Sequence, residues 1–180
     1  VAAYVLGPNR LAFVFHAERR TEPVVLVELL EFADSEREQA YRTQLAQPAA
    51  AMIHALGGES LWRAHIGDVV AGQASDAWST LGLVRYPSRV ALIELVTSGD
   101  YRALRGARDA AVKRSAIFAA RPLGDFSVQP PMGGNAPRSE FHAVRMLCAA
   151  HDDSIDVYTA KWLAQDEQML QRHGGELRWR

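Results

Sequence analysis

The chain has 180 residues, of which 48% are hydrophobic and 23% are charged, and its formal net charge is −1. This composition is ordinary for a globular protein, and the interleaving of basic and acidic residues excludes the basic stripe that a nucleic-acid partner would require. No apolar run is long enough to cross a membrane, and the first residues lack the pattern of a signal peptide, so a cytoplasmic protein without a membrane partner is expected.

Residues 1–23 are an N-terminal segment whose apolar stretch LAFVFHA, residues 11–17, predicts an extra strand. The following stretch, PVVLVELLEF, is apolar on both alternating faces, which predicts a strand over residues 24–32 that is covered on both sides. Ser35 and Glu38 then have the spacing of a capping box, in which the serine caps the helix and the glutamate reaches back. We therefore expect the first helix to begin at Ser35.

This first helix is expected to run through a proline. Apolar residues recur at helical spacing from Tyr41 to Leu56, with Pro48 between them. A proline inside a helix removes one hydrogen bond, so the helix should kink or restart there. The pair Gly57-Gly58 is typical of a left-handed helix end, and a second strand is expected over about residues 59–70.

Residues 80–120 are predicted to form a strand, an interrupted helix and a further strand. A short strand over residues 80–86 ends at Pro87, and Ser88 can cap the helix that follows. The sequence Ser98-Gly99-Asp100 interrupts this helix, and a second helical piece is predicted over about residues 101–113. A strand at residues 116–120 completes the unit.

The order strand, helix, strand, strand, helix, strand over residues 24–123 predicts one complete ferredoxin-like α+β unit with an antiparallel sheet. Both helices would cover one face of that sheet. The other face would also be apolar, and an apolar sheet face of that size calls for a partner. We therefore expect a homodimer or a pseudo-dimer formed through sheet faces, which is a dimeric α+β barrel.

An internal repeat predicts the rest of the chain. The stretch from Tyr41 to Arg63 aligns without gaps with the stretch from Tyr158 to Arg180, sharing Gly-Gly-Glu and Trp-Arg at equivalent positions. Residues 124–140 are rich in proline and glycine and are expected to be a linker. Residues 141–180 then read as a partial second unit, strand-helix-strand, so the chain has a tandem-repeat form.

Two short motifs resemble a widespread bacterial family, a domain of unknown function in the dimeric α+β-barrel superfamily. They are Val84-Arg85-Tyr86-Pro87-Ser88 at the end of a strand and Ser98-Gly99-Asp100-Tyr101 at a helix break. The chain departs from the family pattern at Glu28, where the family often has asparagine, and at Gly99, which replaces a proline. The superfamily includes cofactor-free monooxygenases, lactone isomerases, polyketide cyclases and haem enzymes, so the resemblance implies a fold more than a function.

Glu28 is the most distinctive candidate for a functional residue. It interrupts an apolar strand, where a carboxylate is costly to bury unless it is paired. It could be a general base or a substrate anchor. It could instead be a structural ion-pair member, with Arg63 or Arg85 as its partner, or with Arg145 if the two copies pack as a pseudo-dimer.

Six other residues complete the predicted site. His65 is the second catalytic candidate, as an acid–base histidine beside an aromatic wall, with an ordinary strand histidine as the alternative. The substrate-binding candidates surround it or carry the family motif, and Arg85 could bind a carboxylate. They are Trp62, Arg63, Arg85, Tyr86 and Tyr101.

No metal or cofactor is expected. Cys148 is the only cysteine, no glycine-rich phosphate loop precedes a helix, and no serine or cysteine lies in a nucleophile-elbow pattern. Three functions stay open: a small-molecule-binding protein, a cofactor-independent monooxygenase or isomerase acting on a small aromatic or polyketide-like substrate, and a structural oligomerisation module. A cavity that contains Glu28 or His65 would favour the enzyme.

Overall fold

A computed structural model describes residues 2–6, 11–15, 21–69, 73, 77–120, 161 and 164–174, and the backbone alone for residues 2–6 and 11–15. The chain divides into two compact units, Val1–Pro122 and Leu123–Arg180. In the first unit, β1 (Ala2–Leu6) and β2 (Leu11–Phe15) pair as an antiparallel hairpin. The apolar stretch predicted as an extra strand contains β2.

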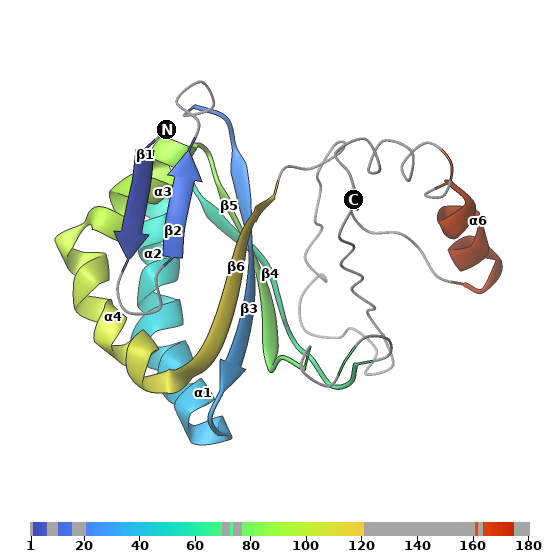
Figure 1. The fold of residues 1–180 in the computed structure, drawn as a ribbon, viewed down its shortest axis with the longest axis horizontal. Coiled ribbons are helices and arrows are strands. Elements are labelled where there is room, and N and C mark those ends of the chain that lie inside the picture. The colour runs from blue at the N-terminus through green and yellow to red at the C-terminus, as the bar shows by residue number, and fades with distance from the viewer. Residues whose placement is uncertain are drawn as a thin grey trace. The chain divides into compact units, whose positions relative to one another are not determined.

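The main sheet of the first unit has four strands, β3 (Val24–Phe32), β4 (Glu59–His65), β5 (Thr80–Tyr86) and β6 (Val112–Ala120). Their order across the sheet is β4-β5-β3-β6, and every neighbouring pair is antiparallel. The helices between these strands lie on one face of the sheet (Figure 1). This is the predicted ferredoxin-like α+β fold.

The first helical segment is divided into α1 (Ser35–Tyr41), a π-helical turn η2 (Arg42–Ala46) and α2 (Gln47–Ala55). Its cap is Asp34, whose Oδ1 accepts a hydrogen bond of 2.8 Å from the backbone N–H of Arg37. The prediction that Ser35 is the cap was wrong by one residue. Aspartate and serine cap about equally well, so the sequence alone could not separate them.

The π-helical turn ends at Ala46, two residues before Pro48. Proline has no N–H, so the usual helical bond to the carbonyl four residues earlier cannot form. The N–H of Gln47 instead donates to the carbonyl of Arg42, five residues earlier. The segment therefore accommodates its proline by widening for one turn, and the helix continues. Leu45 within this turn and Ala49 after it are both buried.

The C-terminus of α2 is closed by the two glycines, as predicted. Gly57 has a φ of 74°, in the left-handed region that favours glycine. The N–H of Gly57 donates to the carbonyl of His54, and the N–H of Gly58 donates to the carbonyl of Ile53, both at 2.9 Å. These two bonds form a Schellman motif.

The second helical segment consists of α3 (Arg89–Thr97) and α4 (Gly99–Ala111), with Ser98 between them. Ser88 caps α3, as predicted, by accepting from the N–H of Ala91. The predicted end of the second helix and the predicted start of the last strand were both late, because β6 begins at Val112 with no intervening loop. Val112 is β-branched and buried, which favours the strand.

Ser98→Ala should destabilise the first unit by about 1 kcal/mol, the usual cost of a lost helix cap. The Ser98 hydroxyl oxygen accepts from the N–H of Tyr101 at 3.2 Å, and the hydroxyl donates to the carbonyl of Leu95 at 2.8 Å, so it closes one helix and opens the next. Urea denaturation would measure the loss. Ser98→Asp, which can still cap, should recover most of it, and equal stability of the alanine and aspartate variants would contradict this role.

The core between the sheet and the helices consists of two clusters. On β3, Val24 and Leu26 belong to one cluster, and Leu30 and Phe32 belong to the other. Alternate residues of a strand point to the same face, so Glu28 points toward the helices at the boundary between these clusters. The fold thus places a carboxylate in the middle of its apolar core face.

In the second unit, the structure describes α6 (Ala164–Arg172) and a following glycine, Gly174, with a φ of 76°. The alignment of Tyr41 with Tyr158 places α6 on the positions of α2 and Gly174 on the position of Gly57. The local structure therefore agrees with the sequence repeat at this helix and its end. The linker and the rest of the partial second unit lie outside the described residues. No described helix is long and apolar enough to cross a membrane.

Candidate ligand-binding site

A cavity of about 80 Å³ lies between the sheet and the helices of the first unit. Leu26, Val84 and Ile117 line it from three strands, and Leu45 and Ile53 line it from the helical segment. A water molecule occupies roughly 10–15 Å³ on this scale, so the space accepts several waters or one small organic molecule. Most of its wall is apolar, as is typical of small-molecule sites.

The carboxylate of Glu28 is the central polar group of this cavity. Its Oε2 lies 3.5 Å from Nη2 of Arg63, and the two side chains are 20% and 33% exposed. The predicted alternative of an ion pair with Arg63 is therefore realised, at a distance long for a charge-assisted hydrogen bond. Both residues still line the cavity, so the pair leaves the carboxylate facing the space.

Gly82 allows this pair to form. It is the β5 residue opposite Glu28 on β3 and also opposite Arg63 on β4, so the three residues form one row across the sheet. A Cβ at Gly82 would lie 3.4 Å from Nη2 of Arg63 and 3.5 Å from Oε2 of Glu28. Because glycine has no side chain, the guanidinium can reach across β5 to the carboxylate.

A bulge in β4 sets which of its side chains enter the site. The pairing of β4 with β5 shifts between Ser60 and Trp62, so that Arg63 is opposite Gly82. An extra residue changes the alternation of a strand from that point onward. Arg63 therefore lies on the cavity side, together with Ser60, and Trp62 lies on the opposite face of the sheet.

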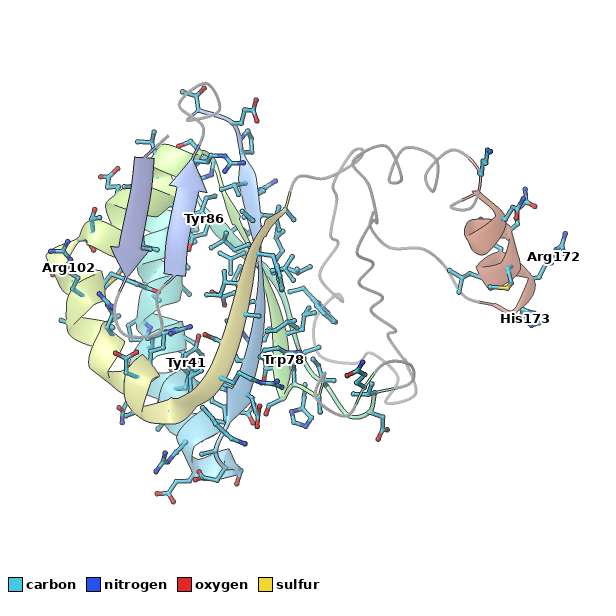
Figure 2. All side chains as sticks on the ribbon, viewed as in Figure 1. Tyr41, Trp78, Tyr86, Arg102, Arg172 and His173 are labelled. Carbon is cyan, nitrogen blue, oxygen red and sulfur yellow. The ribbon has the colours of Figure 1, made fainter. Side chains whose placement is uncertain are left out.

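Three tyrosines surround the carboxylate, Tyr41 from α1, Tyr86 from β5 and Tyr101 from α4. Burial raises the pKa of each phenol, and the nearby negative charge of Glu28 raises it further. At neutral pH all three are therefore protonated and can donate hydrogen bonds. Tyr41 and Tyr86 are labelled in Figure 2, between the helices and the sheet.

Tyr41 also fixes the position of Arg63. The guanidinium carbon of Arg63 lies 5.8 Å from the centre of the Tyr41 ring, within the range of a cation–π interaction. Phe32 also packs against this ring, at 5.2 Å between centroids and with the two planes tilted by 56°. Tyr41 thus connects the polar site to the apolar core.

The folded protein should resist ionisation of these three phenols and lose stability at high pH. Their pKa values are raised above about 10, the value of the unfolded chain, so the stabilisation is complete below that pH and is lost as the pH rises from there toward the higher pKa of the folded state. Absorbance of phenolate near the ultraviolet edge should show fewer than the five tyrosines of the chain titrating before unfolding. Titration of all five with one midpoint in the folded protein would contradict the buried arrangement.

The structure separates the seven predicted site residues into two groups. Glu28, Arg63, Tyr86 and Tyr101 line the cavity. The other three, Trp62, His65 and Arg85, are not among its lining residues.

These three residues lie elsewhere on the sheet. Arg85 points to the face opposite the helices, where its Nη2 contacts Oε2 of Glu59 at 2.7 Å. His65 is exposed at the end of β4, opposite Thr80, and Trp62 is opposite Leu83. The cavity therefore brings the catalytic candidate Glu28 together with three of the binding candidates and leaves the second catalytic candidate outside.

Five further polar residues of the site were not predicted, namely Tyr41, Ser60, Arg105, Arg108 and Asp109. A signal for two of them exists, because Tyr101, Arg105 and Arg108 are spaced as one face of a helix. Tyr41 was recognised only as a helical apolar position. In the described part of the chain, no group of three or more histidine, cysteine, aspartate or glutamate residues could hold a metal ion.

Comparison with known proteins supports the fold. No model of a protein family and no curated protein matches the sequence, so the family resemblance remains a prediction. Among solved structures, the chain is similar to the RPA0582 protein of unknown function from Rhodopseudomonas palustris, with 23% identity and a TM-score of 0.53. That match covers 59% of this chain and 86% of the other.

A second similar structure is Rv0793 from Mycobacterium tuberculosis, with 22% identity and a TM-score of 0.44. The match covers 59% of this chain and all of the other, 100%. The similarity to the RPA0582 protein, at 23% identity, shows a shared fold alone. The function of the chain therefore has to be argued from its own cavity.

Proposed function

We propose that the protein binds a small, largely apolar organic molecule in the cavity between its sheet and its helices. The observation that carries this proposal is the cavity itself, which contains a carboxylate, 3.5 Å from its arginine partner, in a largely apolar surrounding. An apolar pocket with a few convergent polar groups is the usual form of a ligand site. Glu28 and the three tyrosine hydroxyls are the groups that would orient the ligand.

The competing structural explanation, that Glu28 exists only to pair with Arg63, accounts for less of what is observed. A pair that served stability alone would be expected to exclude the space around it, because a partly buried ion pair is costly unless its remaining hydrogen bonds are satisfied. Here the pair is 3.5 Å long and borders open volume. A bound ligand with a hydroxyl group would supply a donor to the carboxylate.

Thermal denaturation with a panel of single-ring phenols would test the binding. A compound present at about ten times its Kd should stabilise the protein by about 1.4 kcal/mol. Glu28→Gln should lose at least part of this stabilisation, because the carboxylate acceptor is replaced by an amide. Glu59→Gln removes a carboxylate from the ion pair on the opposite sheet face and should retain it. A role for Glu28 would be contradicted if Glu28→Gln kept the full stabilisation, or if both variants lost it to the same extent.

A second candidate function follows from the same carboxylate. We infer that Glu28 could act as a general base in a cofactor-independent enzyme, an isomerase or a monooxygenase, by removing an acidic proton from the bound molecule. The positive charge of Arg63 and the protonated tyrosines would stabilise the resulting anion. Exchange of an acidic C–H of added aromatic ketones with solvent deuterium, followed by NMR, would test this step. Glu28→Gln should abolish the exchange. Exchange at the same rate with the variant as with the unaltered protein would exclude the base role.

Assembly and family membership are proposals as well. On the sheet face that points away from the helices, β3 and β5 carry mostly buried apolar side chains beside the charged Glu31 and Arg85, and Phe118 on β6 is 50% exposed. A face of this kind supports self-association as a homodimer or pseudo-dimer, as in a dimeric α+β barrel. The tandem-repeat form of a bacterial family is proposed on the sequence motifs and on the agreement between α2 and α6, and a cytoplasmic location is kept as a proposal from the sequence alone.

A further inference from the structure

The charges that border the cavity are unequal. Arg63, Arg105 and Arg108 line it as cations, and Glu28 and Asp109 line it as anions. Two of the cations are already engaged. Arg63 contacts Glu28, and Nη2 of Arg108 donates to the hydroxyl of Ser115 at 2.9 Å.

Arg105 is the remaining cation. Within the described part of the chain, its guanidinium forms neither a hydrogen bond nor an ion pair, although Asp109 follows it by one helical turn. Its side chain is half-buried. A partly desolvated guanidinium without a partner is unfavourable, and it gains most from a planar anion that can accept two hydrogen bonds.

The position of Arg105 on its helix directs it to the site. Tyr101, Arg105 and Arg108 follow one another by four and three residues, which places them on one face of α4. Burial and the negative charge of Glu28 raise the pKa of the Tyr101 phenol, and the positive charges of Arg108 and Arg105 oppose this rise. Arg102, on the same helix, is exposed and lies on its outer side (Figure 2).

We propose that the ligand of this cavity is a small organic monocarboxylate whose carboxylate binds Arg105. This rests on the proposed small-molecule function and specifies its chemical class. The apolar body of the ligand would contact Leu26, Val84 and Ile117, and a hydroxyl at its other end would donate to Glu28. A dianion such as a phosphate is disfavoured, because Glu28 and Asp109 border the same small space.

Three matched probes distinguish binding of a carboxylate from binding of small apolar molecules in general. We would measure the Kd of 4-hydroxybenzoate, of the neutral 4-hydroxybenzamide and of phenol by NMR titration of the full chain. The acid should bind at least tenfold more tightly than the amide. Arg105→Gln should abolish this preference while leaving the affinity for the amide and for phenol within about twofold, because only the charge contact is lost.

Arg102→Gln is the control, since it removes the same charge from the exposed side of the same helix and should keep the full preference. Equal affinity for acid and amide in the unaltered protein, or an undiminished preference in Arg105→Gln, would overturn the carboxylate proposal and leave small-molecule binding standing. Absence of binding by all three probes would overturn both.

Discussion

Gly58→Ala should destabilise the first unit by about 3 kcal/mol, at the upper end of the cost of overpacking a closely packed core. Gly58 is the second glycine of the helix end and is buried between α2 and the sheet. A Cβ there would lie 2.7 Å from Cγ2 of Ile53 and 2.9 Å from the carbonyl oxygen of Arg85. The oxygen belongs to a strand backbone and cannot move without disturbing the pairing of β4 with β5.

Gly106→Ala is the matched control for this substitution. Gly106 lies in the interior of α4, and a Cβ there meets nothing within 4 Å. Alanine should therefore stabilise the helix by roughly 0.5–1 kcal/mol. Urea denaturation, combined with hydrogen exchange of peptides from β3, would measure both changes in the same unit. A Gly58→Ala protein as stable as the parent would show that the helix end does not approach the sheet as described.

Gly82→Val should weaken ligand binding at least tenfold and leave the protein folded. The valine methyl groups would occupy the gap through which Arg63 reaches Glu28, and they would fill part of a cavity of only about 80 Å³. We expect affinity for any cavity ligand to fall at least tenfold, which corresponds to about 1.4 kcal/mol. Valine is favoured in strands, so stability should not fall in parallel.

Gly82→Ala provides the intermediate step of this series. Its Cβ would lie at 3.4–3.6 Å from the two side chains, which is ordinary contact, so most of the affinity should survive. Calorimetric titration of the three proteins with one phenol would establish the order glycine, alanine, valine. Undiminished binding by the valine variant would place the ligand outside this cavity.

The elements of the fold were largely predictable from sequence because strong local signals marked them. Gly57-Gly58 predicted the Schellman end of α2, and Ser88 predicted the cap of α3. Boundaries without such a signal were misplaced. The start of β6 at Val112 is one example, because no turn residue separates it from α4.

The candidate site was predictable only in part, because its composition depends on the faces of strands. Glu28 stood out as a charge in an apolar strand, and the structure places it in the cavity. His65 and Arg85 had equally suitable chemistry, but one lies at an exposed strand end and the other on the opposite face. The extra residue in β4 breaks the strict alternation on which a sequence argument about Trp62 and Arg63 would depend.

The same irregularity in β4 has a consequence for solubility. Of the strands described in this sheet, β4 and β6 are the outermost, and each pairs with its neighbour through a register shift, at Ser60/Trp62 and at Glu31/Phe32. A flat outer strand is a template on which a foreign strand can add, and a bulge twists that template out of line. Both borders of the sheet are therefore poor seeds for fibril growth, and removing either bulge should make the protein more prone to aggregate.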